Sequence, residues 1–192
     1  MSHQHKVVAI VGSTSAVSRT KALAEAIVET LATRVPVAVE YLELRTLAPQ
    51  IGTAFDKSGL GPQALAALKA IESADLIVAA TPVYKASYSG LFKHLIDFIA
   101  PDALVGRPVL LAATGGSDRH ALVVDQSLRS LFSFFRAQTV PSAVYASEGD
   151  FDGYTLRSEP LKARILEAAR QAERLLGGTS VRPREEALLA AA

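Results

Sequence analysis

The segment VVAIVGSTSAVSRTKAL, residues 7–23, decides the fold. A continuous run of apolar residues ends at Gly12, small and polar residues follow, and an amphipathic helical pattern begins at residue 19. A strand without polar alternation is typical of a parallel sheet with both faces covered. Between strand and helix, the sequence leaves room for either a bound phosphate or a tight turn.

The same succession of strand and helix repeats along the chain. We predict strands over residues 6–12, 37–42, 75–80, 108–113 and 139–146, and helices over 19–33, 62–73, 88–99, 119–135 and 157–176. Glu40 in the second strand and Pro141 in the fifth favour edge positions, since a charge or a missing N–H is tolerated there. These elements predict a flavodoxin-like three-layer α/β fold, with a five-stranded parallel sheet in the order 2-1-3-4-5 and helices on both faces.

The length and composition predict one domain without special targeting. The chain has 192 residues, of which 49% are hydrophobic, and a formal net charge of +1. We expect a single domain over residues 1–176 and a C-terminal tail over 177–192, where two glycines should stop the last helix. The balanced charge argues against nucleic-acid and membrane partners, and the absence of cysteine excludes thiolate chemistry and Cys-ligated metals. We expect a soluble cytoplasmic protein without a metal site.

The first loop of interest, GSTSAVSRT, combines hydroxyl groups with a helix N-terminus. Ser13, Ser18 and Thr20 supply hydroxyls, Arg19 supplies a charge, and the first-turn amides of the helix favour an anion. The loop lacks the glycines of a dinucleotide fingerprint and the Gly-Lys-Ser/Thr of a P-loop. It suits a single terminal phosphate, although Ser18 could equally be a simple N-cap.

Two further loops follow the predicted third and fourth strands. TPVYKASYSG offers a rigid proline, a cation and two tyrosines whose rings can lie against a flat heterocycle. TGGSDRH offers two hydroxyls and a backbone without side chains, which a ligand can approach closely. Each loop alone could be an ordinary connection. Because the carboxyl ends of parallel strands meet at one edge, the three together predict a site for a mononucleotide with a flat ring, and FMN is the candidate on this topology.

Three stretches of the sequence resemble a known family. GSTSAVSRT, ATPVYKASYSGLFKHLIDF and LAATGGSDRHALVVD look like the NAD(P)H-dependent FMN reductases. They are most similar to the reductase components of two-component alkanesulfonate and methanesulfonate monooxygenases. The similarity runs from about residue 6 to about residue 175, and TPVYKASYSG is its most specific part.

The resemblance implies an FMN site, with NADPH or NADH as hydride donor. The phosphate would be held by Ser13, Ser18, Arg19 and Thr20; the ring and ribityl chain by Pro82, Val83, Tyr84 and Lys85; and the polar edge of the flavin by Thr114, Gly115, Gly116 and Ser117. No catalytic residue is implied, because hydride transfer needs no protein acid, base or nucleophile. The expected partner is a flavin-dependent monooxygenase that receives reduced FMN in sulfur metabolism.

The resemblance also implies a homodimer or homotetramer with helix 119–135 at its interface. In one branch of the family this helix carries an inserted tyrosine that distorts it, and Gln126 stands at that place here. Independently, the helix is apolar on several sides, which favours a cover beyond its own sheet. Its apolar residues are Leu122, Val123, Val124, Leu128, Leu131, Phe134 and Phe135.

Two departures from the family concern the first loop: Thr14 stands where proline is common, and Arg19 is its only cation.

Two other functions compete with FMN reduction. A flavodoxin-type electron carrier is disfavoured, because such carriers are strongly acidic and this chain has a net charge of +1. A quinone, azo-dye or metal-oxyanion reductase with permanently bound FMN would use the same three loops. Retention or loss of flavin on gel filtration would separate this alternative from a reductase that exchanges its flavin.

Overall fold

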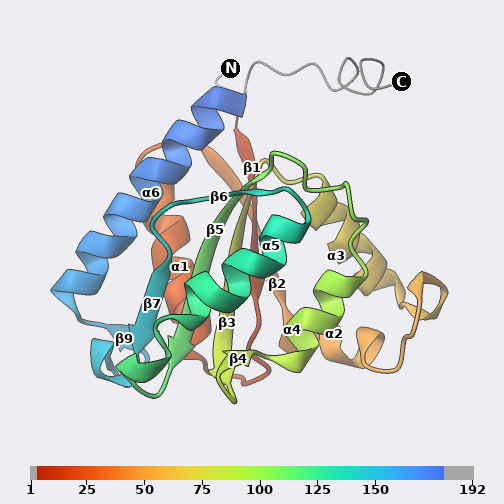
Figure 1. Ribbon diagram of the computed structural model, residues 1–192, viewed down its shortest axis with the longest axis horizontal. Helices are drawn as coiled ribbons and strands as arrows, with labels where there is room; N and C mark the ends of the chain where they lie inside the picture. The colour runs from red at the N-terminus through yellow and green to blue at the C-terminus, as the bar shows by residue number, and fades with distance from the viewer. Residues whose placement is uncertain (1–3, 180–192) are drawn as a thin grey trace.

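Strand β3 (Leu76–Tyr84) lies at the centre of a mostly parallel sheet in the computed structural model, which describes residues 4–179 (Figure 1). Its parallel neighbours are β1 (His5–Val11) and β5 (Pro108–Gly115), and β2 (Val37–Glu43) pairs with the outer side of β1. Two short strands, β6 (Gln138–Thr139) and β7 (Val144–Ser147), both pair with β5. The flavodoxin-like order 2-1-3-4-5 is therefore confirmed.

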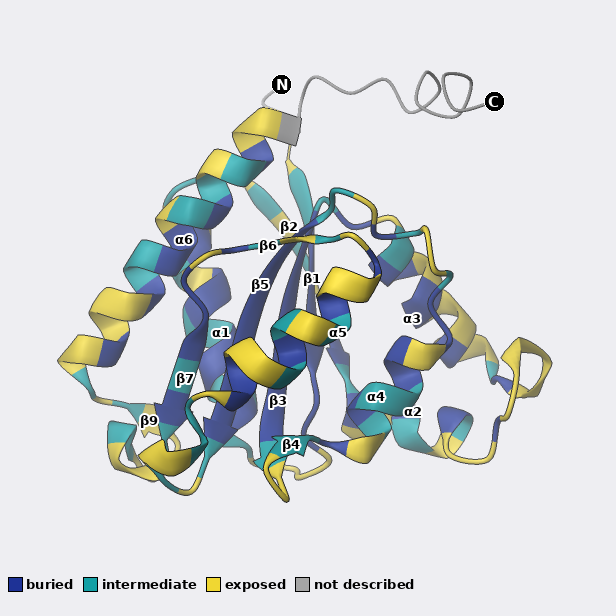
Figure 2. Ribbon diagram, viewed as in Figure 1, coloured by how far each residue is buried: buried dark blue, intermediate teal, exposed yellow. Residues whose placement is uncertain are grey.

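Helices cover both faces of the sheet (Figures 1 and 2). Helices α1 (Arg19–Ala32) and α6 (Glu159–Thr179) cover one face, while α2 (Leu44–Ile51), α3 (Pro62–Glu72), α4 (Gly90–Asp97) and α5 (Arg129–Phe134) cover the other. Side chains of β1 alternate between the two cores: Val8 and Ile10 face α2–α5, and Val7, Ala9 and Val11 face α1 and α6. Among the described residues, no helix is long and apolar enough to cross a membrane.

The two edges of the sheet differ in how far the sequence predicted them. At β2 the prediction is confirmed, since Glu40 and Tyr41 are exposed. At the other edge a single strand over 139–146 is wrong, because the ladder breaks around Pro141 and leaves β6 and β7 as separate strands. The sheet therefore has seven strands rather than five, the remaining one being β4 (Ser87–Tyr88), which forms an antiparallel hairpin with β3.

Arg129 compensates for the broken strand. Its guanidinium donates to the Val140 and Pro141 carbonyls, both at 3.1 Å, and to Thr139 Oγ1 at 2.9 Å. Asp125, one turn earlier, pairs with the same group at 2.7 Å. Carbonyls that lose their ladder partners are thereby satisfied by a charged donor.

Replacing this arginine tests the account of the edge. Arg129→Met keeps the aliphatic stem but leaves the carbonyls without their donor, and we expect the free energy of unfolding to fall by about 2–3 kcal/mol. Urea denaturation measures the change. Arg136→Met is the matched control, because Arg136 is exposed, and it should change stability by less than about 0.5 kcal/mol. Equal effects of the two substitutions would contradict this role of Arg129.

Helix α2 was missed in the sequence, where residues 44–51 read as the start of a loop. Leu44, Leu47 and Ile51 are buried along one side of this helix and pack against the α3 side of the core. Pro49 lies inside the helix, and proline usually argues against a helical interior. Here it stands in the last turn, where few hydrogen bonds remain to be lost, and the apolar stripe prevails.

The predicted helix 119–135 is not continuous. It consists of a 3-10 turn (Asp118–His120), a π-helical turn (Val124–Leu128) and α5. The π turn contains Gln126, so the chain is distorted at the place that the resemblance implied. Val124, Leu128 and Phe135 are buried in the chain's own core. The outer side of the segment is mixed, since Asp125 and Gln126 are exposed, and so are Leu122 and Phe134.

Helix α6 extends further than the sequence predicted. Gly177 and Gly178 do not end it, and it runs to Thr179. Ala168, Ala169 and Ala172 are fully buried against α1 and the sheet, so the helix is anchored well before its end. The rest of the predicted tail, residues 180–192, lies outside the described residues.

Candidate functional site

The three predicted ligand loops meet at one end of the sheet, at the bottom of Figure 1. They follow the carboxyl ends of β1, β3 and β5, which are adjacent strands in the order β1-β3-β5. The loop after β7, residues 147–154, reaches the same end and was not singled out in the sequence. An open parallel sheet binds its ligands in this position.

Gly12 begins the first loop in close contact with β3. Its amide donates to the Ala80 carbonyl at 2.7 Å, and a Cβ at this position would lie 3.0 Å from that oxygen and from Thr81 Cα. Ser89 then holds the same residue from the second loop, with its hydroxyl donating to the Gly12 carbonyl at 3.0 Å. The glycine is thus required by the approach of two backbones, and the first two loops are joined.

Ser89 is a positioning residue that the sequence analysis missed. Besides Gly12, its hydroxyl caps α4 by accepting from the Phe92 amide at 3.3 Å, and its own amide donates to Thr81 Oγ1 at 3.2 Å. The signal was present: serine directly before Gly90 and an amphipathic helix is a common N-cap. The cap also explains why α4 begins at Gly90 rather than at residue 88.

The hydroxyls of the first loop are partly engaged within the chain. Ser18 is the N-cap of α1, accepting from the Lys21 amide at 3.3 Å. Its own O–H remains available to an acceptor, since a hydroxyl has one proton to donate. Ser13 is buried and accepts from the Ser15 amide at 3.2 Å in the same way.

Thr20 and Thr114 connect the first loop to the third. Their hydroxyl oxygens lie 2.6 Å apart, and both residues are buried. Only one of the two protons is used between them, because one hydroxyl donates and the other accepts. The pair can therefore still donate one hydrogen bond to a phosphate or a flavin edge.

The second loop is a tight hairpin with an unusual backbone. Lys85 and Ala86 form its two-residue turn with φ angles of 49° and 64°, while Tyr84 and Ser87 pair across it. Two successive positive φ angles fit a type I′ hairpin, which normally carries asparagine or glycine. Holding ordinary residues in this region stores strain, a common property of ligand loops. Pro82 is buried, Val83 is half-buried, and Tyr84 and Lys85 are exposed.

Gly115 and Gly116, the two glycines of the third loop, have different surroundings. A Cβ on Gly115 would lie 2.2 Å from the Tyr145 hydroxyl, which donates to the Ser117 carbonyl at 2.5 Å. A Cβ on Gly116 would meet nothing within 4 Å, and this residue is exposed. Burial raises the pKa of Tyr145, and the nearby carboxylates of Asp118 and Asp150 raise it further, so the phenol keeps its proton. Gly116 is therefore the position left open to a ligand.

This difference predicts opposite outcomes for two alanine substitutions. Gly115→Ala should push Tyr145 off the Ser117 carbonyl and lower the free energy of unfolding by about 1–2 kcal/mol. Gly116→Ala should change it by less than about 0.5 kcal/mol. Thermal and urea unfolding measure both. Tyr145→Phe added to Gly115→Ala should recover part of the loss, and no recovery would contradict the steric account.

The Arg19 guanidinium, which the resemblance assigns to the flavin phosphate, is already engaged by the loop after β7. Its Nη2 lies 2.9 Å from Glu148 Oε1, its Nε donates to the Gly153 carbonyl at 3.0 Å, and the guanidinium lies 5.7 Å from the ring centre of Tyr154. The structure thus joins the first loop to the loop after β7. Thr20 bonds to Thr114, and Ser89 bonds to Gly12. Tyr84 and Lys85, on the hairpin, are exposed.

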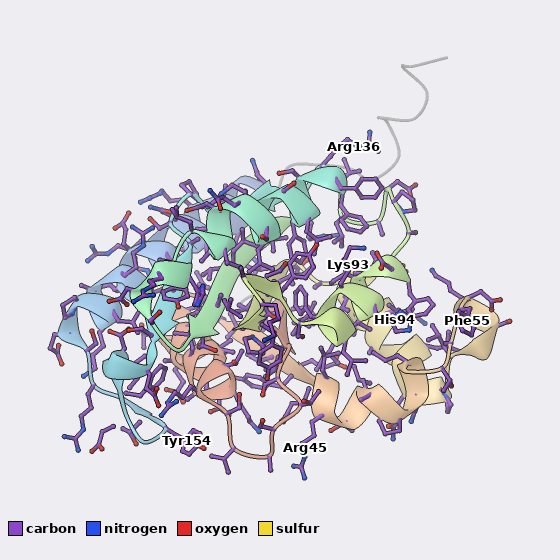
Figure 3. All side chains as sticks on the ribbon, turned by 60° about the horizontal axis from the view of Figure 1, so that its bottom comes forward. Arg45, Phe55, Lys93, His94, Arg136 and Tyr154 are labelled. Carbon is purple, nitrogen blue, oxygen red and sulfur yellow. The ribbon has the colours of Figure 1, made fainter. Side chains whose placement is uncertain are left out.

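A hollow of about 590 Å³ lies elsewhere, lined by residues that include Phe55, His94 and Phe98. Its lining comes from the loop before α3, from the last turn of α4 and from the residues that follow α4, whereas the ligand loops lie at the start of that helix. Phe55 and His94 lie beside each other at the far right of Figure 3, on the loop before α3 and on α4. We place the function at the strand ends, because hydroxyls, helix-end amides and an open backbone converge there.

A family model for the NADPH-dependent FMN reductases matches residues 5–152. The chain belongs to this family. It is 50% identical to "FMN reductase (NADPH)" of Pseudomonas aeruginosa over 180 residues, which cover 94% of this chain and 97% of that one. It is also 50% identical to "NADH-dependent FMN reductase SfnF" of Pseudomonas fluorescens, over 95% of this chain and 97% of the relative. The resemblance seen in the sequence is thereby confirmed.

A solved structure supports the same placement. An oxidoreductase from Corynebacterium diphtheriae is 36% identical, with a TM-score of 0.83 over 92% of this chain and 99% of that one. At the level of the family, the predicted enzyme class and the cofactors FMN and NAD(P)H are confirmed. The two relatives of equal identity are named for different dinucleotides, so overall similarity does not select NADH or NADPH.

Proposed function

We propose that this NAD(P)H-dependent FMN reductase supplies reduced FMN to a partner flavin-dependent monooxygenase in the use of sulfonates or other organosulfur compounds. The observation that carries the proposal is the phosphate end of the site. Arg19, the one cation of the loop GSTSAVSRT, is already paired with Glu148, which favours a flavin that is held weakly and passed on. Because the reaction consumes NAD(P)H, the enzyme would work in the cytoplasm, where these dinucleotides are regenerated.

The residues at the strand ends fit FMN by their chemistry. The free protons of Ser13 and Ser18, the one left by the Thr20–Thr114 pair, and the first-turn amides of α1 would donate to the phosphate, with Arg19 beside them. The hairpin would place Pro82, Val83, Tyr84 and Lys85 along the ring and ribityl chain. The open backbone at Gly116, between Thr114–Gly115 and Ser117, would meet the polar edge of the flavin.

The chain's own part in catalysis is positioning and electrostatics. FMN, when bound, supplies the electron-accepting ring, and NADH or NADPH supplies the hydride. The exposed Lys85 ammonium and the backbone amides of the third loop would stabilise negative charge at the ring. The hairpin turn fixes the backbone from which the Lys85 side chain extends, at a φ of 49°.

A flavin-reduction assay tests the proposed activity. The purified protein with FMN should oxidise NADH or NADPH, followed by the loss of nicotinamide absorbance. Absence of oxidation with every flavin tried would overturn the proposal. FMN should also separate from the protein on gel filtration, whereas retained flavin would favour the quinone, azo-dye or metal-oxyanion reductase. Adding a sulfonate monooxygenase should give sulfonate oxidation that depends on both proteins.

We also propose a homodimer or homotetramer with the segment 119–135 at an interface. Leu122 and Phe134 are 62% and 67% exposed on this segment, although its other apolar side chains are covered by the chain's own core. Large apolar side chains at two exposed points of one element support an interface. Light scattering should give the mass of a dimer or tetramer, and Phe134→Ser should lower it. A monomeric wild-type protein would contradict this proposal.

A further inference from the structure

The loop after β7 contacts Arg19, the only cation in the loop GSTSAVSRT. Glu148, Gly153 and Tyr154 contact the Arg19 guanidinium through an ion pair, a hydrogen bond and the face of a ring. These contacts join residues more than 120 positions apart in sequence, across the end of the sheet where the flavin phosphate is proposed to lie. None of them follows from the sequence motifs that point to FMN.

Glu148 is held in place independently of Arg19. It opens a 3-10 turn (Glu148–Asp150) in which Ser147 and Asp150 form a capping box, with the Ser147 amide donating to Asp150 Oδ2 at 2.8 Å. The Asp150 carbonyl in turn accepts from the Arg157 amide at 2.9 Å. Strands β8 (Phe151–Asp152) and β9 (Thr155–Leu156) close the loop as a hairpin, and Gly153 supplies the positive φ of its turn, 61°. The backbone that carries Glu148 is therefore held by contacts that do not involve Arg19.

The other nearby cation is engaged as well. Lys21, in the first turn of α1, donates to Glu43 Oε1 at 2.6 Å, and this hydrogen bond raises the pKa of the lysine above its ordinary value. Both positive charges at the start of α1 are thus matched by carboxylates from other elements. A phosphate dianion arriving here would meet hydroxyls and amides directly, but would have to share Arg19 with Glu148.

We propose that Glu148 is an affinity-lowering residue for the flavin phosphate. Its carboxylate partly neutralises Arg19 and places a negative charge beside the incoming phosphate, so FMN binds more weakly and leaves faster than the site would otherwise allow. The ligand feature concerned is the terminal phosphomonoester of a mononucleotide. The inference rests on the proposed role of Arg19 at the phosphate. In this proposal, the loop after β7 controls how readily reduced flavin is released.

Glu148→Gln isolates the charge from the contact, since the amide oxygen can still accept from Arg19. We expect the FMN dissociation constant to fall about two- to fivefold, the range of an exposed ion pair, and FMN release to slow. Flavin-fluorescence titration and stopped-flow release at fixed ionic strength measure the two quantities. Riboflavin, which lacks the phosphate, should bind the variant and the wild type equally.

Asp152→Asn is the matched control. Asp152 is a carboxylate of the same loop, has the same exposed side-chain fraction as Glu148, 62%, and pairs with Arg157 rather than Arg19. The substitution removes one negative charge from the same loop and leaves the contacts of Arg19 unchanged. It should leave the FMN dissociation constant within about 1.5-fold of the wild type. A gain equal to that of Glu148→Gln would mean that net charge alone acts, and would overturn the specific role of Glu148.

Arg19→Ala separates failure of this inference from failure of the proposed site. It should weaken FMN binding about tenfold without affecting riboflavin. In its background Glu148→Gln should tighten FMN binding less than it does in the wild type, because only the direct repulsion between Glu148 and the phosphate is left to remove. If Arg19→Ala leaves the FMN-to-riboflavin ratio unchanged, Arg19 does not hold the phosphate and the proposed site is wrong. If Arg19→Ala behaves as expected but Glu148→Gln weakens FMN binding or leaves it unchanged, the site stands and the inference falls.

Discussion

The hydrogen bond from the Gly12 amide to the Ala80 carbonyl fixes how closely β1 and β3 end together. No side chain fits between the two backbones there, and the Ser89 hydroxyl closes the same gap from the other side. The first loop and the hairpin loop therefore leave the sheet from one shared point. Because Ser89 also caps α4, the start of that helix is tied to the same place. The ligand site is an extension of the buried sheet rather than a set of independent loops.

The fold could be predicted because its strongest signals are local. The unbroken apolar run of β1 and the exposed charge of Glu40 at an edge each indicate a position in the sheet without reference to the rest of the chain. The break in the strand at Pro141 was harder to predict from the sequence. Its energetic cost depends on whether a distant donor forms hydrogen bonds with the carbonyls that lose their ladder partners. Arg129 does so, and nothing in the sequence around residue 141 announces it.

That the three loops meet at one end of the sheet could be predicted from the sequence, whereas the contacts between them could not. Hydroxyls and glycines after strands identify a ligand edge by type alone, as do the tyrosines. Which partner each side chain takes is a long-range property. Gly115 is small because Tyr145 crosses over it, and Arg19 is turned toward Glu148, from a segment that carries no recognisable motif. The types of ligand-binding residue could thus be identified from short stretches of sequence. The partners of their charged groups could not, because they come from loops that meet only in the folded chain.

The bond between Thr20 and Thr114 bridges two strands that are not neighbours. Thr20 stands at the start of the helix that follows β1, Thr114 lies on β5, and β3 runs between these strands. The hydrogen bond therefore ties the first loop to the third across the end of the middle strand. Because each hydroxyl has the other as a partner, a ligand that bonds to one of them changes what the other can donate or accept. The two loops are thus coupled through a single pair of hydroxyls.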